Sequence, residues 1–354
     1  MSLLDSGPRS IAAVKVLRIG LTDRCNFRCV YCMPEAGVEW LNNSLILSFD
    51  EIVEVVRVAA DLHHIANVKL TGGEPTVRPG LAQLVRRLRA IGSTRDLSMT
   101  TNGMLLERLA GPLRDAGLDR VTVSIDSLRP DRFRRITRTG DLHTVLRGVD
   151  AACEAGFSSL KINCVAMRGI NDDEFADFAA LTVANRITVR FIEYMPLGDA
   201  VVQHAGVSPD EVGPAASCGG QDRGNVFVSE ATIRARIEER LGPLIGVDRT
   251  TEAGAGPAKV YRLARGNSAG RIGFISAMSA PFCATCNRLR LTAAGVLRSC
   301  LFEGGEVDLK PLLRRQPAGG RRTAMLAQAM VDCIRLKPVV HGEHGTEQMS
   351  RIGG

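Results

Sequence analysis

The sequence predicts an α/β protein built around a parallel sheet. Through the first two-thirds of the 354 residues, short segments rich in Val, Ile, Leu and Thr alternate with longer amphipathic segments. Strands that alternate with helices along a chain pair in parallel, and the helices cover the sheet. Six such units are fewer than the eight of a closed barrel, so the pattern fits either an incomplete barrel or an open doubly wound sheet.

The predicted strands are bounded by Gly, Asp or Asn. They cover Lys15–Leu21, Asn67–Thr71, Asp96–Thr101, Arg120–Ile125, Leu160–Ala166 and Thr188–Glu193. The predicted helices repeat apolar residues at helical spacing. They cover Asp50–Leu62, Pro79–Ile91, Met104–Ala116, His143–Ala155 and Asp172–Ala184. A ligand site in such a fold lies at the carboxyl ends of the strands, and we expect function there.

The alternation ends after Met195 and Pro196. Residues 198–227 are rich in Gly, Ala, Pro and Ser, which predicts a long loop or insertion. Beyond it we expect a helix at Glu230–Leu241 and a loop at Gln316–Arg322. Between them we expect three strands of a smaller unit, at Val260–Leu263, Arg271–Ser276 and Arg288–Leu291. The expected organisation is therefore a core (1–197), an insertion (198–227) and a C-terminal region (228–354).

Composition and charge narrow the class of protein. Hydrophobic residues make up 45% and charged residues 23%, which excludes a disordered or fibrous chain. No apolar run could span a bilayer and the N-terminus lacks a signal pattern, so we expect a cytoplasmic protein without membrane contact. The formal charge of +7 suits an anionic ligand, whereas 4% aromatic residues are few for a nucleic-acid binder, and no nucleic-acid partner is expected.

The first cysteine trio (Cys25, Cys29 and Cys32) has the spacing C-x3-C-x2-C and directly follows the first predicted strand. Clustered cysteines in a cytoplasmic chain indicate metal ligands or redox groups rather than disulfides. Three thiolates on one loop can bind three irons of a 4Fe-4S cluster and leave the fourth iron open to a ligand. A zinc knuckle is the alternative, but structural zinc takes four ligands and no His stands close in the sequence.

The second cysteine trio (Cys283, Cys286 and Cys300) has the spacing C-x2-C-x13-C. A C-x2-C loop followed by two strands can also bring three thiolates together, and we interpret this trio as a second 4Fe-4S site with an open iron. A zinc ribbon lacking one ligand and a redox C-x2-C pair are the alternatives. The other cysteines have no partner at ligand spacing and are interpreted as core residues or bystanders: Cys153, Cys164, Cys218 and Cys333.

The first trio, with Tyr31 before its last cysteine, resembles the signature of the radical S-adenosylmethionine superfamily. The resemblance implies that S-adenosylmethionine chelates the open iron and is cleaved by one electron to a 5′-deoxyadenosyl radical. The TGGEP stretch that ends the second strand would alone be a plain turn. Beside this loop it resembles the superfamily's site for the methionine amino group. The cofactor contacts implied are Tyr31, Gly73, Ser124 and Met195.

The chain more closely resembles the GTP 3′,8-cyclase family, also called molybdenum cofactor biosynthesis protein A. The matching stretches run from residue 17 to 354: LRIGLTDRCNFRCVYCMP, KLTGGEP, TTNG, VTVSIDSL, KINCV, RFIEYMP, FCATCNRLRLTAAG and the terminal IGG. The resemblance implies an incomplete (β/α)6 TIM-like barrel with a C-terminal α+β region that carries an auxiliary 4Fe-4S cluster. GTP is expected between the two clusters.

The resemblance also implies the reaction. The deoxyadenosyl radical would remove hydrogen from C3′ of GTP, and the C3′ radical would attack C8 of guanine. The product is 3′,8-cyclo-7,8-dihydro-GTP, formed by a lyase-type enzyme of molybdenum cofactor biosynthesis. Partners would be a flavodoxin-like or ferredoxin-like reductant and the next enzyme of the pathway, and the chain is expected to act as a monomer or homodimer.

A triphosphate substrate needs several cations, and the predicted strands carry basic residues that could supply them. We expect them to converge at one end of the sheet and to bind GTP: Arg18, Lys69, Lys161, Arg190, Arg288 and Arg290. Thr100 is implied by the resemblance as a polar contact to the nucleotide, and Lys161, Arg288 and Arg290 are candidates to stabilise or protonate an intermediate. The family usually has Arg where this chain has Lys69, so charge is kept but bidentate geometry is lost.

Two other functions fit part of the pattern. A radical peptide-modifying enzyme can also carry auxiliary clusters, but it would not need cations on so many strands. A non-catalytic iron–sulfur or zinc regulator that binds nucleic acid would need a helix-turn-helix or an aromatic-basic strip, and the sequence shows neither. The terminal Gly353-Gly354 either enters the site as a tail without side chains or frays, and the sequence supports both equally.

Overall fold

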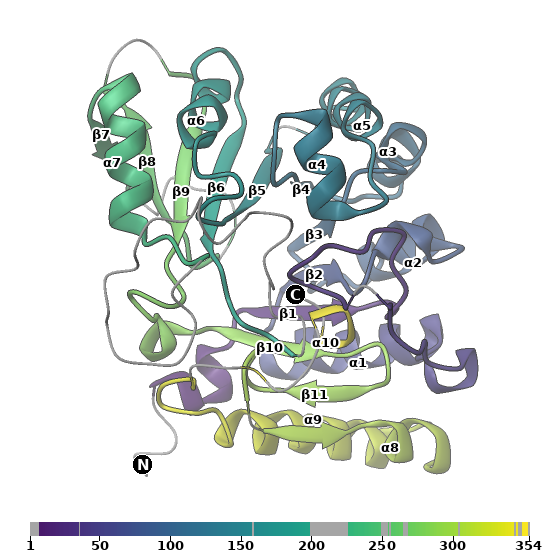
Figure 1. The fold of residues 1–354 in the computed structure, drawn as a ribbon. Helices are drawn as coiled ribbons and strands as arrows, with labels where there is room; N and C mark the ends of the chain where they lie inside the picture. Colours follow the sequence, from purple (N-terminus) through teal and green to yellow (C-terminus); the bar gives the residue numbers. More distant parts are fainter. Residues whose placement is uncertain are drawn as a thin grey trace.

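Twelve strands form one continuous curved sheet in the part of the chain that the computed structural model describes (Figure 1). The described residues are 7–34, 36–157, 159–198, 226–248, 254, 256–264, 268–303, 305–342, 345 and 349–352. Most of the predicted insertion, Cys218 and the terminal Gly353-Gly354 lie outside them. None of the helices among these residues is long and apolar enough to cross a membrane.

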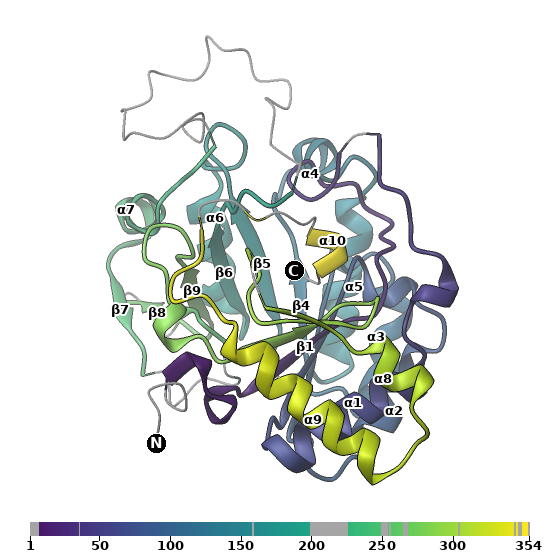
Figure 2. The ribbon, with the colours of Figure 1, turned by 90° about the horizontal axis from the view of Figure 1, so that it is seen from below.

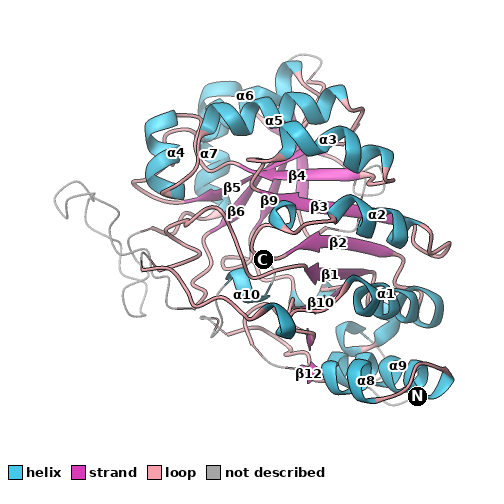
Figure 3. Ribbon diagram, turned by 90° about the vertical axis from the view of Figure 1, so that its right-hand side faces the viewer, coloured by secondary structure: helices cyan, strands magenta, loops and turns pink. Residues whose placement is uncertain are grey.

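The centre of the sheet is the predicted series of parallel strands. Strands β1 to β6 pair consecutively and in parallel, each within one residue of its predicted bounds. They are β1 (Val16–Gly20), β2 (Asn67–Thr71), β3 (Asp96–Thr101), β4 (Arg120–Ser124), β5 (Lys161–Ala166) and β6 (Thr188–Glu193). Figure 3 shows β1 to β4 in order with helices along one side of them. The expected α/β architecture is therefore confirmed.

The C-terminal strands join this sheet instead of forming the smaller unit that we expected. Strand β9 (Arg271–Ile275) pairs in parallel with β6, and β10 (Arg288–Leu291) pairs in parallel with β1. Four strands extend the edges in antiparallel order: β7 (Leu244–Gly246), β8 (Lys259–Leu263), β11 (Val296–Arg298) and β12 (Glu306–Asp308). The edges of a six-stranded parallel sheet leave backbone N–H and C=O groups unpaired, and β10 and β9 pair with those of β1 and β6.

Helices follow the strands along the chain and bury their apolar faces against the sheet. They are α1 (Phe49–His63), α2 (Leu81–Arg89), α3 (Leu106–Asp115), α4 (Pro130–Thr137), α5 (Leu142–Glu154), α6 (Phe175–Ala184), α7 (Glu230–Leu241), α8 (Lys310–Arg315), α9 (Gly320–Arg335) and α10 (Met349–Ile352). Helix α1 shows how the local sequence forms such a helix. Ser48 and Glu51 form a capping box at its start, and Ile52, Val55 and Val56 on one face are fully buried.

Helix α9 begins inside the predicted loop Gln316–Arg322, so the loop is confirmed for residues 316–319 and the prediction was wrong for residues 320–322. Gly319 and Gly320 precede and begin the helix, and glycine is a poor helix former, which hid its start in the sequence. The helix is held by tertiary contacts, because Leu326, Met330 and Ile334 are fully buried. Helix α9 lies beside α1 (Figure 2) and also contacts β11.

Helix α4, which the sequence analysis missed, supports the loop of the first cysteine trio. The last carbonyls of a helix have no partner within it. In α4 the carbonyls of Ile136 and Thr137 accept hydrogen bonds from the backbone N–H groups of Val30 and Arg28, each at 3.0 Å. The loop between Cys25 and Cys32 is thus tied to the end of a helix.

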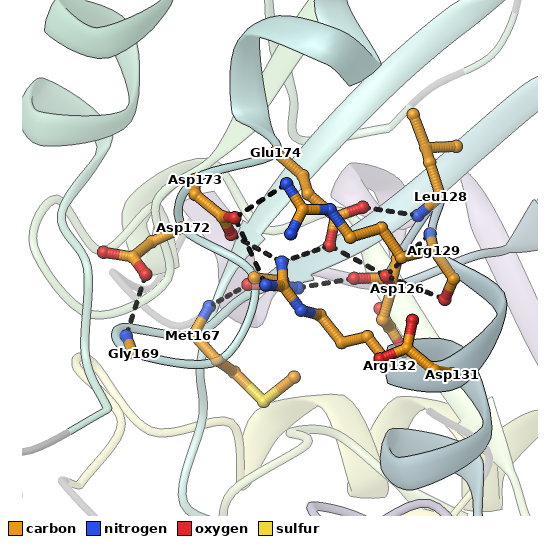
Figure 4. Close-up of polar contacts among 12 residues, drawn as sticks. Asp126, Leu128, Arg129, Asp131, Arg132, Met167, Gly169, Asp172, Asp173 and Glu174 are labelled. Carbon is orange, nitrogen blue, oxygen red and sulfur yellow. Dashed lines mark hydrogen bonds and ion pairs between the residues drawn. The ribbon is translucent and has the colours of Figure 1, made fainter. Parts of the chain in front are cut away.

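A buried carboxylate joins the connection after β4 to the connection after β5 (Figure 4). Glu174 is 1% exposed and accepts hydrogen bonds from the Leu128 N–H at 2.6 Å and the Ser127 hydroxyl at 2.8 Å, and it also binds Arg132. Asn171 donates to the carbonyl of Asp126 at 2.7 Å. These contacts fix the backbone that follows Ser124 at the carboxyl end of β4.

Replacing Glu174 by Ala should destabilise the fold by about 3 kcal/mol, because a buried N–H, a hydroxyl and a guanidinium each lose an acceptor. Chemical denaturation measures this loss. Asp131→Ala is the matched control, since Asp131 lies on α4 with its side chain 69% exposed and pairs only with Arg135 at 3.4 Å among the contacts described. It should cost less than about 1 kcal/mol. Equal losses in the two variants would contradict the role of Glu174.

Candidate functional site

A single cavity inside the curved sheet is lined by all eight parallel strands from β10 to β9 and by both cysteine trios. Except for Thr101, which follows Thr100 at the end of β3, the strand residues that line it alternate, as residues on one face of a strand do. All of the predicted site residues are among those that line it: Arg18, Cys25, Cys29, Tyr31, Cys32, Lys69, Gly73, Thr100, Ser124, Lys161, Arg190, Met195, Cys283, Cys286, Arg288, Arg290 and Cys300.

The two trios lie at opposite ends of this cavity. The first trio follows β1 and therefore lies at the carboxyl ends of the parallel strands. Cys283 and Cys286 precede β10, which runs parallel to β1, so they lie at the amino ends of the strands. A hydrogen bond agrees with this placement: the N–H of Lys15, just before β1, donates to the carbonyl oxygen of Asn287, just before β10, at 2.8 Å. Cys300 follows β11, which returns antiparallel to β10. The length of β1, roughly 13 Å between its first and last residues, separates the two ends.

The basic residues occupy the interior of the barrel between the two trios. Arg18 is the middle residue of β1, and it is in register with Lys69 on β2 and Arg290 on β10. We expected these cations to converge at one end of the sheet. Arg18, Lys69 and Arg290 instead lie in the middle of their strands, whereas Lys161 and Arg288 are the first residues of β5 and β10. Inward-facing positions recur at every second residue along a strand, so the middle of a strand also faces the cavity.

Burial and like-charge repulsion both act on this concentration of positive charge. Burial and then the charges of Arg190 and Arg18 hold the pKa of Lys69 well below its usual value. Burial and the neighbouring Arg288 lower the pKa of Arg290 to about 9. Within the described lining, Asp96 is the carboxylate that pairs with a cation, Arg120. A polyanion bound here would relieve both the burial and the repulsion.

The other carboxylates of the lining have structural partners near the first trio. Glu74 accepts hydrogen bonds from the Thr101 hydroxyl at 2.6 Å and the Asn102 N–H at 2.7 Å, joining the ends of β2 and β3. Asp126 accepts from the Tyr31 hydroxyl at 2.7 Å and from the Val165 N–H at 2.8 Å. Asp126 therefore ties the first cysteine loop to β5.

The two glycines of TGGEP are required by the cysteine loop itself. A Cβ on Gly72 would lie 2.5 Å from the carbonyl oxygen of Thr22, and one on Gly73 would lie 2.5 Å from that of Asp23 and closer still to that of Arg24. Gly73 N–H also donates to Thr22 O at 2.7 Å. Close backbone packing of this kind admits only glycine. The turn thus positions the first trio, in addition to lining the cavity.

The donor chemistry of each trio fits an iron–sulfur cluster. Each trio presents three thiols, the soft ligands that such clusters use, toward one cavity. Burial, followed by the nearby Glu74, raises the pKa of Cys25 to about 12, so metal must replace protons on this trio. Although burial alone would raise it, the charges of Arg288 and Lys337 lower the pKa of Cys286 to about 7. No three His, Cys, Asp or Glu side chains among the described residues stand close enough to hold one metal ion.

Thr100, the expected polar contact to the nucleotide, is among the residues that line the cavity. Its hydroxyl is buried and finds no hydrogen-bond partner among the described residues, although Thr100 lines the cavity. Buried hydroxyl groups normally have a partner, so a bound molecule would supply one. Of the remaining cysteines, Cys164 and Cys333 are buried and Cys153 is exposed.

Four residues of the site and its surroundings were missed by the sequence analysis. Asn163 and Thr122 accept hydrogen bonds from Arg190 at 2.9 and 3.3 Å. Both stand two residues from a predicted site residue on the same strand, so the period of two could have found them. Lys337 contacts Cys286, and His341 lines the cavity, but each is a lone residue in the C-terminal region without a motif.

Comparisons with known proteins identify the family of the chain. The family described as Radical SAM superfamily matches residues 19–182, and the family described as Molybdenum Cofactor Synthesis C matches residues 187–343. The chain is 45% identical over 345 residues to the GTP 3′,8-cyclase of Pelotomaculum thermopropionicum, covering 96% of this chain and 98% of that one. It is 44% identical over 356 residues to the GTP 3′,8-cyclase of Desulforamulus reducens, covering 99% and 100%.

Among solved structures, Streptococcus suis SuiB bound to precursor peptide SuiA aligns with a TM-score of 0.55 at 14% identity. The alignment covers 90% of this chain and 64% of that chain. SuiB bound to S-adenosylmethionine aligns with a TM-score of 0.52 at 15% identity, covering 89% and 65%. At these identities the likeness shows the shared fold alone.

Replacing Gly73 by Ala should displace the first cysteine loop, because the new methyl group meets backbone that cannot move aside. We expect a loss of roughly 1–3 kcal/mol of stability and a sharp fall in iron bound by the first trio after anaerobic reconstitution. Gly92→Ala is the control, since a Cβ there meets nothing within 4 Å. Thermal melting and iron analysis measure both effects, and normal iron uptake by the Gly73 variant would contradict this explanation.

Proposed function

The chain belongs to the GTP 3′,8-cyclase family of the radical S-adenosylmethionine superfamily, and from this we propose that it converts GTP into 3′,8-cyclo-7,8-dihydro-GTP in molybdenum cofactor biosynthesis. One observation carries the proposal. A thiol trio lies at each end of a single cavity, and a row of cations lies between them. This arrangement offers a radical source, a second metal site and a polyphosphate site along one line.

The first trio fits the 4Fe-4S cluster and the S-adenosylmethionine that the family uses. Cys25, Cys29 and Cys32 would hold the cluster, and its open iron, when S-adenosylmethionine is bound, supplies the radical chemistry. We assign four lining residues at the carboxyl ends of the strands to S-adenosylmethionine: Tyr31, Gly73, Ser124 and Met195. Tyr31 is held by Asp126, so its ring has a fixed position for a nucleoside.

The second trio supports a second 4Fe-4S cluster at the other end of the cavity. Cys283, Cys286 and Cys300 would hold it through three thiolates, leaving a position for the guanine edge of GTP. The positive charge of Arg288 favours the thiolate form of Cys286, which metal binding requires. Guanine at this end and S-adenosylmethionine at the other would place the ribose between them.

The cations between the trios would bind and orient GTP. Arg18, Lys69, Lys161, Arg288 and Arg290 would hold the triphosphate and ribose, with the Thr100 hydroxyl as a further contact. Arg groups match phosphate oxygens bidentately, and orientation lowers the barrier for attack of C3′ on C8. We assign Lys161, Arg288 and Arg290 to the reacting part of the nucleotide, where a fixed cation stabilises developing charge or supplies a proton.

Partners follow from this chemistry. We propose that a flavodoxin-like or ferredoxin-like protein supplies the electron, that the next pathway enzyme takes the product, and that the chain acts as a monomer or homodimer. The division into a core (1–197) and a C-terminal region (228–354) is part of the same proposal. A peptide-modifying enzyme, the alternative from the sequence, would not account for cations buried between two trios.

One anaerobic incubation tests the function. The reconstituted protein, given GTP, S-adenosylmethionine and dithionite, should form 5′-deoxyadenosine and 3′,8-cyclo-7,8-dihydro-GTP, both identified by mass spectrometry. Iron analysis should find about eight irons per chain if both trios are filled. Omitting GTP should abolish the cyclised product. Cleavage of S-adenosylmethionine without any cyclised nucleotide would contradict the proposed reaction.

Replacing Lys69 by Met should separate binding from stability. The variant loses one charge-assisted contact to phosphate, which should weaken GTP binding about tenfold or more. Its unliganded form should melt no lower than the parent, because like-charge repulsion and the burial of an ammonium are both removed. Lys259→Met, on an exposed side chain that pairs with Glu230, is the control and should bind GTP normally. Unchanged GTP affinity of the Lys69 variant, measured by calorimetry, would contradict this role.

A further inference from the structure

Lys337 is a buried lysine whose ammonium, among the described residues, has its hydrogen-bond partners in the loop of the second cysteine trio. It is 3% exposed. Its ammonium donates to the carbonyl oxygens of Cys286 at 3.1 Å and Arg288 at 3.0 Å, and it lies 3.6 Å from the Cys286 thiol sulfur. Lys337 is not among the residues that line the cavity. The ammonium therefore contacts the C-x2-C loop without lining the cavity.

Capping of helix α9 does not explain this geometry. A cation after the end of a helix commonly binds the helix's own last carbonyls. The backbone of Lys337 does contact α9, through its N–H to Ile334 O at 3.0 Å. Its ammonium, however, reaches carbonyls that lie 51 and 49 residues earlier in the chain. The side chain thus joins α9 to the C-x2-C loop.

The charge of Lys337 also lacks a carboxylate partner among the described residues, where its recorded interactions involve Cys286, Cys300 and Arg288. A buried ammonium without a counter-charge is costly. The anion available to offset it is on the cysteine side, because an iron–sulfur core held by three thiolates carries net negative charge, which grows on reduction. Arg288 adds a second cation beside the same sulfur, with its guanidinium 3.7 Å from Cys286 Sγ.

We propose that Lys337 is a positioning residue of the second cluster: its ammonium holds the backbone from Cys286 to Arg288 in place, and its charge beside the Cys286 sulfur raises the cluster's reduction potential. A fixed cation stabilises the reduced, more negative state of a cluster more than the oxidised state. The inference rests on the proposed second cluster at Cys283, Cys286 and Cys300. It assigns Lys337 no contact with GTP.

The test is a redox titration of the second cluster followed by electron paramagnetic resonance. The parent is the full-length chain with Cys25, Cys29 and Cys32 replaced by Ala, so that the signal comes from the second trio. Lys337→Gln keeps a donor but loses the charge, and its midpoint potential should be more negative than the parent's. Lys337→Arg keeps the charge and should lie closer to the parent. Arg335→Gln removes a charge from the same helix end, on a side chain 48% exposed, and should leave the potential unchanged.

Each result decides the matter. An unshifted potential in Lys337→Gln, or an equal shift in Arg335→Gln, would overturn the inference and leave the second cluster intact. If Lys337→Gln fails to retain iron, retention by Lys337→Arg supports a need for the charge, and loss in both variants overturns it in favour of a packing role. A parent that binds no cluster would instead refute the proposed second cluster, and the inference with it.

Discussion

The parallel pairing of β10 with β1 is the constraint on which the site depends. Strand β10 comes late in the chain, yet it extends the sheet beside the first strand and in the same direction. That direction places the C-x2-C loop, which precedes β10, opposite the cysteine loop that follows β1. Antiparallel pairing would put both loops at one end of the barrel, and no cavity would separate the two trios.

The barrel interior carries charge where a closed barrel carries branched apolar side chains. The alternation of the strands makes this possible. Leu17 and Ile19 are fully buried on the outward face of β1, against the helices, while Arg18 between them faces the cavity. Apolar burial outside the sheet therefore offsets the cost of cations inside it. A cation at one of these inward positions lowers the stability of the unliganded fold, and the same cation increases the affinity for a polyanion.

Both cysteine loops are held by protein contacts that do not involve metal. The first loop packs on the backbone of Gly72 and Gly73, and its backbone N–H groups donate hydrogen bonds to the last carbonyls of α4. It is also joined to β5 through Tyr31 and Asp126. The second loop is joined to β1 through Asn287 and to α9 through Lys337. Because these contacts already fix the two cysteine loops, less conformational entropy is lost when a ligand binds to them.

The sequence by itself determined the parallel series of strands, because their period and boundary residues are local, and it determined the two trios, because their spacings are covalent. It also identified Arg18 and Lys69 as candidates to bind an anionic substrate. Only the tertiary structure decided that these cations lie in mid-barrel and that the trios lie at opposite ends. Those facts depend on which edge β10 joins and in which direction, and strand partners distant in sequence leave no local pattern. Lys337 and α9 were missed for the same reason, since packing against residues far along the chain defines both.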